Sequence, residues 1–154
     1  MLTTPRWTHI ALPSLDLDTS VDWYLRYTPL SVLDQREDAE GRSAWLAHEG
    51  QVVNPFVLVL VMFNRTQGTP QPQLGPFAHL GIEVPERADV DRLAEMARAE
   101  GCLHWEPTEM PAPVGYICAL KDPDGNVVEI SHDQGVYAKV QEVWGDRDRQ
   151  PAGS

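Results

Sequence analysis

The chain has 154 residues, a length that suits one compact domain or two small fused modules. Its formal net charge of −11 argues against nucleic acid and acidic membranes as partners, because a polyanionic surface repels both. The longest apolar run, residues 56–63, is too short to cross a bilayer, and two cysteines do not make a disulfide framework. We therefore expect a reduced, cytoplasmic protein of the ordinary globular class.

The first half of the chain, residues 5–66, alternates between strand and helix patterns. A helix is predicted between Thr19 and Pro29, because apolar residues in this stretch recur on one helical stripe. Strands are predicted around this helix, at residues 7–12, 31–35, 43–48 and 56–63. The last of these is rich in β-branched residues, so we expect both of its faces to be buried. Residues 67–76 are rich in Pro and Gly and indicate a linker.

The same pattern then starts again over residues 77–133. A helix is predicted over residues 86–100, with Gly101 as its C-terminal stop. Strands are predicted at residues 78–84, 103–106, 116–121 and 127–131, the last two joined by the turn DPDGN. The tail, residues 145–154, is polar, and its composition predicts disorder.

Both halves have the order βαβββ, and their sequences superpose as HIALPSLDLDTSVDWY on HLGIEVPERADVDRLAEM. In each half a histidine opens a strand, and a small residue, Ala11 or Gly81, follows on the same face. Such a repeat indicates a duplicated module. The sequence predicts an α+β fold of two βαβββ modules, whose two sheets face each other.

Three residues stand out when the halves are overlaid: His9, His79 and Glu129. The two histidines occupy equivalent places, and Glu129 lies between apolar residues of the last strand, where an unpaired carboxylate is costly to bury. In the first half, Leu60 takes the place of this glutamate. A divalent cation shared by two imidazoles and a carboxylate would stabilise the arrangement and keep open coordination positions. We expect Fe(II) first, with Mn, Ni, Co or Zn as alternatives.

Taken singly, each of these residues has an ordinary explanation. A strand histidine is commonly a satisfied core or surface residue, and a buried glutamate commonly pairs with Arg or Lys. Other candidates are weaker. Tyr116 begins a strand that would line the same side as Glu129. Its hydroxyl could donate a proton or a hydrogen bond to a substrate, or the ring could be a packed aromatic side chain. Trp45, Leu60 and Phe63 are candidates for the walls of an apolar substrate pocket.

The segments WTHIALPSLDLDTSVDWY, FAHLGIEVPERADVDRL and YICALKDPDGNVVEISH resemble the vicinal oxygen chelate superfamily. This group contains glyoxalases, bleomycin resistance proteins and extradiol dioxygenases, and the resemblance covers about residues 5–133. It implies paired βαβββ modules that form a cup-shaped mixed sheet around a metal. The metal then chelates a small substrate through two neighbouring oxygens. His9, His79 and Glu129 match the ligand positions of the family. Its members are often dimers, so we expect a homodimer.

The resemblance leaves the reaction open. Leu60 stands where glyoxalases carry a fourth ligand, which weakens a lyase or isomerase function. A set of three ligands resembles that of the extradiol dioxygenases or of the fosfomycin-resistance thiol transferases. Extradiol enzymes, however, usually carry a tyrosine where this chain has Ala119. No cluster of Lys, Arg and Ser for a phosphonate is evident. The alternatives are therefore a dioxygenase-like enzyme, a glyoxalase-like lyase or isomerase, and a metal-free, ligand-sequestering protein of the bleomycin-resistance type.

Overall fold

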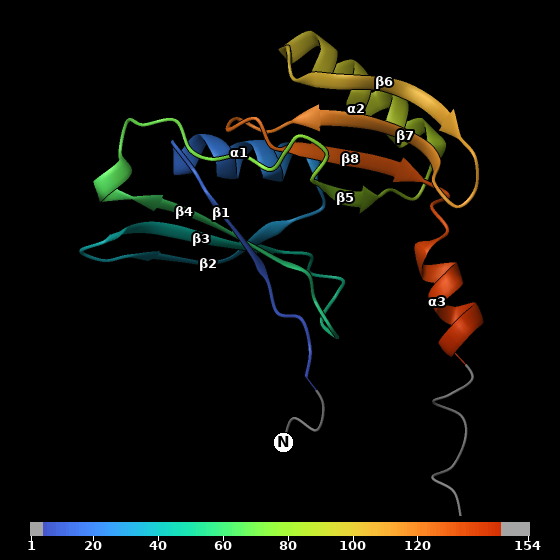
Figure 1. Ribbon diagram of the computed structural model, residues 1–154, viewed down its shortest axis with the longest axis horizontal. Helices are drawn as coiled ribbons and strands as arrows, with labels where there is room; N and C mark the ends of the chain where they lie inside the picture. The colour runs from blue at the N-terminus through green and yellow to red at the C-terminus, as the bar shows by residue number, and fades with distance from the viewer. Residues whose placement is uncertain (1–4, 146–154) are drawn as a thin grey trace, which may run out of the picture. The chain divides into compact units, whose positions relative to one another are not determined.

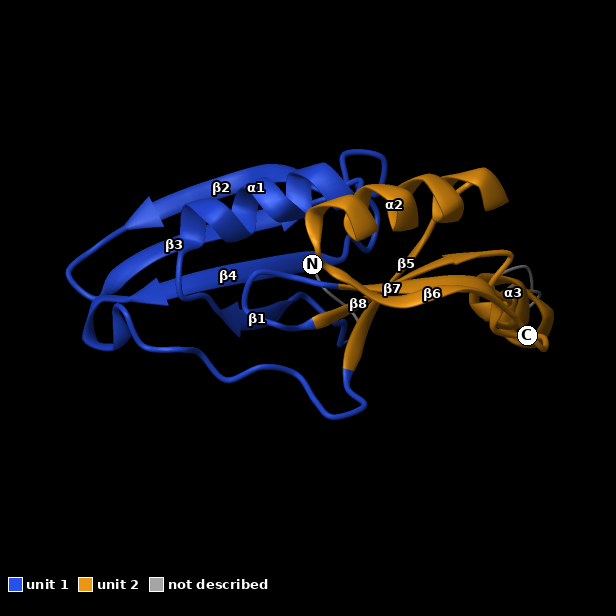
Figure 2. Ribbon diagram, turned by 90° about the horizontal axis from the view of Figure 1, so that it is seen from above, with its two compact units in different colours: residues 1–78, 121–126 blue, residues 79–120, 127–154 orange. Residues whose placement is uncertain are grey.

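The computed structural model describes residues 5–145, which form two compact units (Figure 2). Unit 1 consists of the chain up to residue 78 together with residues 121–126. Unit 2 consists of residues 79–120 and the chain from residue 127 onward. The tail for which the sequence predicts disorder, residues 145–154, lies outside the described residues except for Gly145.

Unit 1 is a four-stranded sheet with one helix packed on it (Figure 1). Its elements are β1 (Ile10–Pro13), α1 (Leu17–Tyr27), β2 (Ser31–Glu37), β3 (Gly41–Ala47), β4 (Val57–Phe63) and a 3₁₀ turn (Asn64–Thr66). The strand order is β1-β4-β3-β2, with β1 parallel to β4 and β3 antiparallel to both of its neighbours. Helix α1 begins where the side chain of Asp16 accepts a hydrogen bond from the N–H of Thr19.

Unit 2 repeats this architecture and adds a helix (Figure 1). Its elements are β5 (His79–Glu83), α2 (Arg87–Glu100), β6 (Leu103–Met110), β7 (Gly115–Lys121), β8 (Val127–His132) and α3 (Val136–Trp144). The strand order β5-β8-β7-β6 matches that of unit 1, and β5 is parallel to β8. Gly101 ends α2 with a φ of 76°, a left-handed conformation that glycine adopts without strain.

The predicted α+β fold with two βαβββ modules is confirmed, and the two sheets share one topology. Some details differ from the prediction, including the start of α1 at Leu17 rather than at Thr19. Strand β1 begins at Ile10, so His9 precedes the strand, whereas His79 is the first residue of β5. Strand β6 extends to Met110, because its second half also pairs with β7. Helix α3 was not predicted, because it has no counterpart in the first half of the repeat.

Only one face of the sheet in unit 1 is covered by its helix. Leu58 and Leu60 of β4 are almost fully buried and lie beside the buried Leu46 and Ala44 of β3, on the face that packs against α1. The alternate residues of β4 lie on the other face. The expectation that residues 56–63 are buried on both faces is therefore wrong outside residues 58–60.

The turn between β7 and β8 belongs to unit 1, where a buried carboxyl group anchors it. The Asp122 side chain accepts hydrogen bonds from the Tyr24 hydroxyl at 2.7 Å and from the Asn126 amide at 2.9 Å. It also accepts from the backbone N–H groups of Asp124 at 3.0 Å and of Asn126 at 2.8 Å. The DPDGN sequence therefore forms a turn that is stabilised by its own hydrogen bonds and is hydrogen-bonded to α1.

We expect the free energy of unfolding to decrease as the pH rises above about 10, partly because of Tyr24. Burial, followed by the neighbouring Asp122, raises the pKa of the Tyr24 hydroxyl. An unfolded tyrosine loses its proton near pH ~10, whereas folded Tyr24 keeps it, so this stabilisation is complete below that pH and lost above it. Urea unfolding at about pH 8 and about pH 11 measures the effect. A Tyr24→Phe variant with the wild-type pH slope would contradict this explanation.

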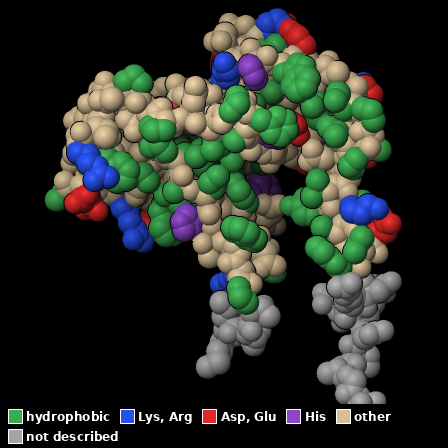
Figure 3. Space-filling view, viewed as in Figure 1, with side chains coloured by type: hydrophobic (Ala, Val, Ile, Leu, Met, Phe, Trp, Pro, Cys, Tyr) green, Lys and Arg blue, Asp and Glu red, His purple; other side chains and the backbone are tan. Residues whose placement is uncertain are grey.

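Helix α3 exposes its apolar side chains, and none of its residues is buried. Hydrophobic side chains are visible on the surface at this helix (Figure 3). They are Val136, Tyr137, Val140, Val143 and Trp144. No helix among residues 5–145 combines the length and the apolar character that a transmembrane span requires.

Candidate metal centre

Two of the three predicted metal ligands lie side by side in unit 2. His79 is the first residue of β5, and Glu129 lies on the neighbouring strand β8, in register with Gly81. Because side chains alternate along a strand, these residues share the face opposite to the buried Val128. The Nε2 atom of His79 is 3.8 Å from the Oε2 atom of Glu129, and the two side chains are 32% and 16% exposed.

The other oxygen of Glu129 has a neutral partner. The side-chain amide of Gln134 donates a hydrogen bond of 2.9 Å to Glu129 Oε1, and the backbone N–H of Gln134 donates one of 3.1 Å to Glu83 Oε1. Within residues 5–145, Glu129 has no ion pair with Arg or Lys. The ordinary explanation of a part-buried glutamate, an Arg or Lys partner, therefore does not apply to Glu129 within the described residues.

The pair fits two ligands of a divalent cation in chemistry and spacing. Imidazole nitrogen and carboxylate oxygen together suit Fe, Mn, Co, Ni and Zn. Two ligand atoms at about 2.1 Å from one ion are roughly 3 to 3.5 Å apart, so the 3.8 Å separation needs only a small side-chain rotation. A Cβ atom added to Gly81 would meet no atom within 4 Å, so the space above this residue is open.

Unit 2 supplies two ligands rather than a complete set. Across the described ranges of the chain, no three His, Cys, Asp or Glu side chains form one cluster that could hold an ion. His79 and Glu129 are brought together, and His9 belongs to the other unit. Open coordination positions are also what substrate chelation requires.

The segment that carries Gln134 is held against the β6–β7 hairpin. The N–H of Gly135 donates a hydrogen bond of 2.7 Å to the Pro113 carbonyl oxygen. Asp133 has a φ of 58°, and Gly115, at the start of β7, has a φ of 84°. A Cβ atom added to Gly115 would lie 2.4 Å from the carbonyl oxygen of His132. Only glycine permits this close approach of the two backbones.

Gly115→Ala is expected to lower the free energy of unfolding by about 2–4 kcal/mol, because it adds both a clash and a strained φ. Thermal unfolding followed by circular dichroism measures the loss. Gly68→Ala is the matched control, since Gly68 has a φ of 76° but a Cβ atom there would meet nothing within 4 Å. An equal loss in both variants would mean that the contact with His132 is unimportant.

His9 lies in unit 1, immediately before β1, and lines a pocket of about 710 Å³. Its Nδ1 atom is 2.8 Å from the Thr8 hydroxyl oxygen, which leaves Nε2 as the ring nitrogen for a ligand. The other lining residues are mostly apolar: Arg6, Trp7, Thr8, Leu33, Trp45, Val52, Val53, Asn54, Pro55 and Val57. A histidine in an apolar pocket with few polar groups is a typical arrangement for binding a small molecule.

The three proposed wall residues lie in different places. Trp45 lines this pocket, and the guanidinium group of Arg36 lies 5.1 Å from its ring. Phe63 is at the far end of β4 from the pocket residue Val57. Leu60 is 1% exposed on the face covered by α1, so it lies away from the pocket.

Strand register also changes the residue that corresponds to Glu129. Gly81 pairs with Glu129 in unit 2, and the equivalent Ala11 pairs with Val59 in unit 1. The counterpart is therefore Val59 rather than Leu60. The fourth ligand position is apolar in either case, so the inference of a three-ligand set is unaffected.

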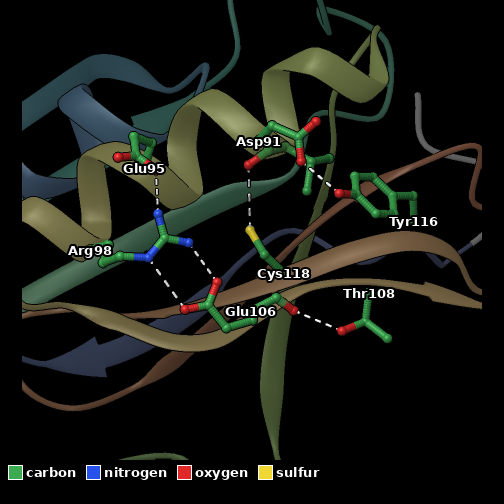
Figure 4. Close-up of polar contacts among 8 residues, drawn as sticks. Asp91, Glu95, Arg98, Glu106, Thr108, Tyr116 and Cys118 are labelled. Carbon is green, nitrogen blue, oxygen red and sulfur yellow. Dashed lines mark hydrogen bonds and ion pairs between the residues drawn. The ribbon is translucent and has the colours of Figure 1, made fainter.

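Tyr116 lies on the helix face of its sheet, away from Glu129. Its hydroxyl donates a hydrogen bond of 2.6 Å to Asp91 of α2 (Figure 4). The guanidinium carbon of Arg87 is 3.5 Å from the centre of the Tyr116 ring. The hydrogen bond to Asp91 raises the pKa of the Tyr116 hydroxyl. Cys118, two residues later on the same face, donates to the Val90 carbonyl oxygen, and burial raises the pKa of its thiol to about 12. Both side chains have structural roles against α2.

Sequence reasoning missed Gln134 and most of the pocket. Gln134 lies between two elements and has no equivalent in the first half, so the repeat did not identify it. The pocket loop contributes Val52 and Val53, both 84% exposed. Two adjacent valines in a polar loop, QVVNP, were the available signal.

Comparison with known proteins identifies the family. Residues 6–130 match the model of the glyoxalase/bleomycin resistance protein/dioxygenase superfamily. An uncharacterized protein of Pseudomonas aeruginosa is 36% identical over 131 residues, which cover 85% of this chain and 91% of that protein.

Solved structures share the fold at low sequence identity. A fosfomycin resistance protein of Listeria monocytogenes, solved as a mutant with Mn(II) and a dihydroxypropylphosphonic acid, is 16% identical with a TM-score of 0.63. The match covers 91% of this chain and 99% of that one. An antibiotic binding protein of Streptomyces is 22% identical with a TM-score of 0.60, and the match covers 86% of this chain and 98% of that one. The same fold thus occurs both with a bound metal and in a binding protein.

Proposed function

Because the chain belongs to the glyoxalase/bleomycin resistance protein/dioxygenase superfamily, we propose that it is a divalent-metal-dependent, dioxygenase-like enzyme acting on a small substrate with two neighbouring oxygens. The observation that carries the proposal is the His79–Glu129 pair, with 3.8 Å between ligand atoms and no Arg or Lys partner for Glu129 among the described residues. When bound, the cation would polarise the substrate oxygens and, as Fe(II), would also activate O₂.

In this proposal His79 and Glu129 hold the cation, and His9 completes the set. His9 is included because it is equivalent to His79 in the repeat. It would come from unit 1 of the same chain, or from unit 1 of a second copy in a homodimer. The apolar pocket beside His9, with Trp45 in its wall, would bind the apolar part of the substrate.

We also propose a cytoplasmic location. Neither Cys102 nor Cys118 forms a disulfide bond, and free thiols are usual in the reducing cytoplasm.

Metal analysis of the purified protein tests the proposal. Protein prepared without oxygen or chelator is expected to contain Fe or Mn in near-stoichiometric amount and to consume O₂ with a catechol. Ni, Co or Zn together with turnover of a hemithioacetal would instead support a glyoxalase-like lyase or isomerase. If the protein binds no metal even after reconstitution, the metalloenzyme proposal is wrong.

A second candidate function is the sequestration of a ligand without metal. The unit 1 pocket favours it, because its lining is largely apolar and includes two tryptophans, the exposed Trp7 and Trp45. Quenching of tryptophan fluorescence by an aromatic ligand in metal-free protein would support this function. If ligand binding requires the metal, the enzyme proposal is favoured over it.

A further inference from the structure

We propose that Gln134 is a positioning residue that orients the Glu129 carboxylate toward His79 and thereby raises the affinity of this pair for a divalent cation. The inference rests on the proposed metal site. The two oxygens of Glu129 have different partners: Oε1 accepts from the Gln134 amide at 2.9 Å, and Oε2 lies 3.8 Å from His79 Nε2. The hydrogen bond thus selects which oxygen faces the histidine.

A neutral donor suits this task better than a basic side chain. Gln134 restricts rotation of the carboxyl group, so less conformational entropy remains to be lost when Glu129 binds an ion. An Arg or Lys at this place would also restrict rotation, but it would compete with the cation for the negative charge. An amide leaves that charge for the ion.

Gln134 is itself fixed on both sides. Its backbone N–H donates to Glu83 Oε1 at 3.1 Å, and the next residue, Gly135, is bonded to the Pro113 carbonyl oxygen at 2.7 Å. The residue before it, Asp133, has a φ of 58° that turns the chain back after β8. Residues 133–135 therefore hold the side-chain amide of Gln134 in place next to Glu129, and a positioning role requires such support.

Gln134→Met tests the role, because methionine has a similar length but no strong donor. We expect this variant to bind Co(II) about 10- to 100-fold more weakly than wild type, with an altered visible spectrum and an unchanged melting temperature of the metal-free protein. Gln141→Met on α3 is the matched control and is expected to behave as wild type. A Gln134→Met variant with wild-type affinity and spectrum would overturn the proposal.

A second measurement separates this proposal from the proposed function. In metal-free protein, the side-chain amide signals of Gln134 in an ¹H–¹⁵N spectrum are expected to shift in Glu129→Ala, while those of Gln141 stay in place. If wild type binds no Co(II) but this shift occurs, the metal site fails and the orientation of Glu129 by Gln134 stands. If the Gln134 signals do not respond to Glu129→Ala, the hydrogen bond and the positioning role are both wrong.

Discussion

Asp122→Ala is expected to lower the free energy of unfolding by about 3–4 kcal/mol, which corresponds to a fall of roughly 10 °C in the melting temperature. Asp122 is 4% exposed and accepts four hydrogen bonds. Its removal leaves the buried Tyr24 hydroxyl and the amide of Asn126 without their acceptor, and each unpaired group costs about 1–3 kcal/mol.

The controls separate the buried acceptor from the rest of the turn. Asp124, less buried, accepts from the Leu15 N–H at 2.9 Å and from the Ser20 hydroxyl at 3.1 Å, so Asp124→Ala is expected to cost about 1–2 kcal/mol. Tyr24→Phe removes only one hydrogen-bond donor, so we expect it to lower the free energy of unfolding by about as much as Asp124→Ala. Urea unfolding gives all three values. An Asp122→Ala loss no larger than that of Asp124→Ala would show that the network is dispensable.

The hydrogen bonds of Asp122 were only partly predictable from the DPDGN motif. The DPDGN segment predicts a turn, because Asp, Pro and Gly at these positions favour one. The sequence does not show that the turn is bonded to a helix of the other half, because that contact joins Tyr24 to Asp122 across most of the chain. A turn can be predicted from the residues within it, whereas a hydrogen bond between residues far apart in the sequence depends on the fold.

The βαβββ order was predictable because the chain repeats it, and the repeat points to His79 through its equivalence with His9. Glu129 stands out separately, as a carboxylate between apolar residues of a strand. Strand faces were less predictable. The prediction that Tyr116 lies on the same side of the sheet as Glu129 is wrong. Its side chain lies on the opposite face of β7, where it binds Asp91 of α2. The alignment of the two halves equates Leu60 with Glu129, whereas the strand register equates Val59 with it. An error of one residue in a strand exchanges the two faces.

His79→Ala and Glu129→Ala are each expected to weaken metal binding by at least about 100-fold, with little loss of folding stability. Each removes one ligand, and a cation-ligand bond is worth more than a hydrogen bond in an outer shell, for which losses are about 10- to 100-fold. Both side chains are partly exposed, so truncation leaves no large cavity. Competition with a coloured chelator measures the affinity.

His104→Ala and Glu83→Gln are the matched controls for these two variants. His104 is an exposed histidine of β6, and Glu83 lies on the same strand as His79 but contacts the backbone N–H of Gln134. We expect His104→Ala to retain the wild-type affinity and Glu83→Gln to lose far less than Glu129→Ala. His9→Ala completes the series, and a loss equal to that of His79→Ala would make His9 the third ligand. If His79→Ala and His104→Ala bind the metal equally well, the ion is held elsewhere in the protein, and the pair on β5 and β8 has only a structural role.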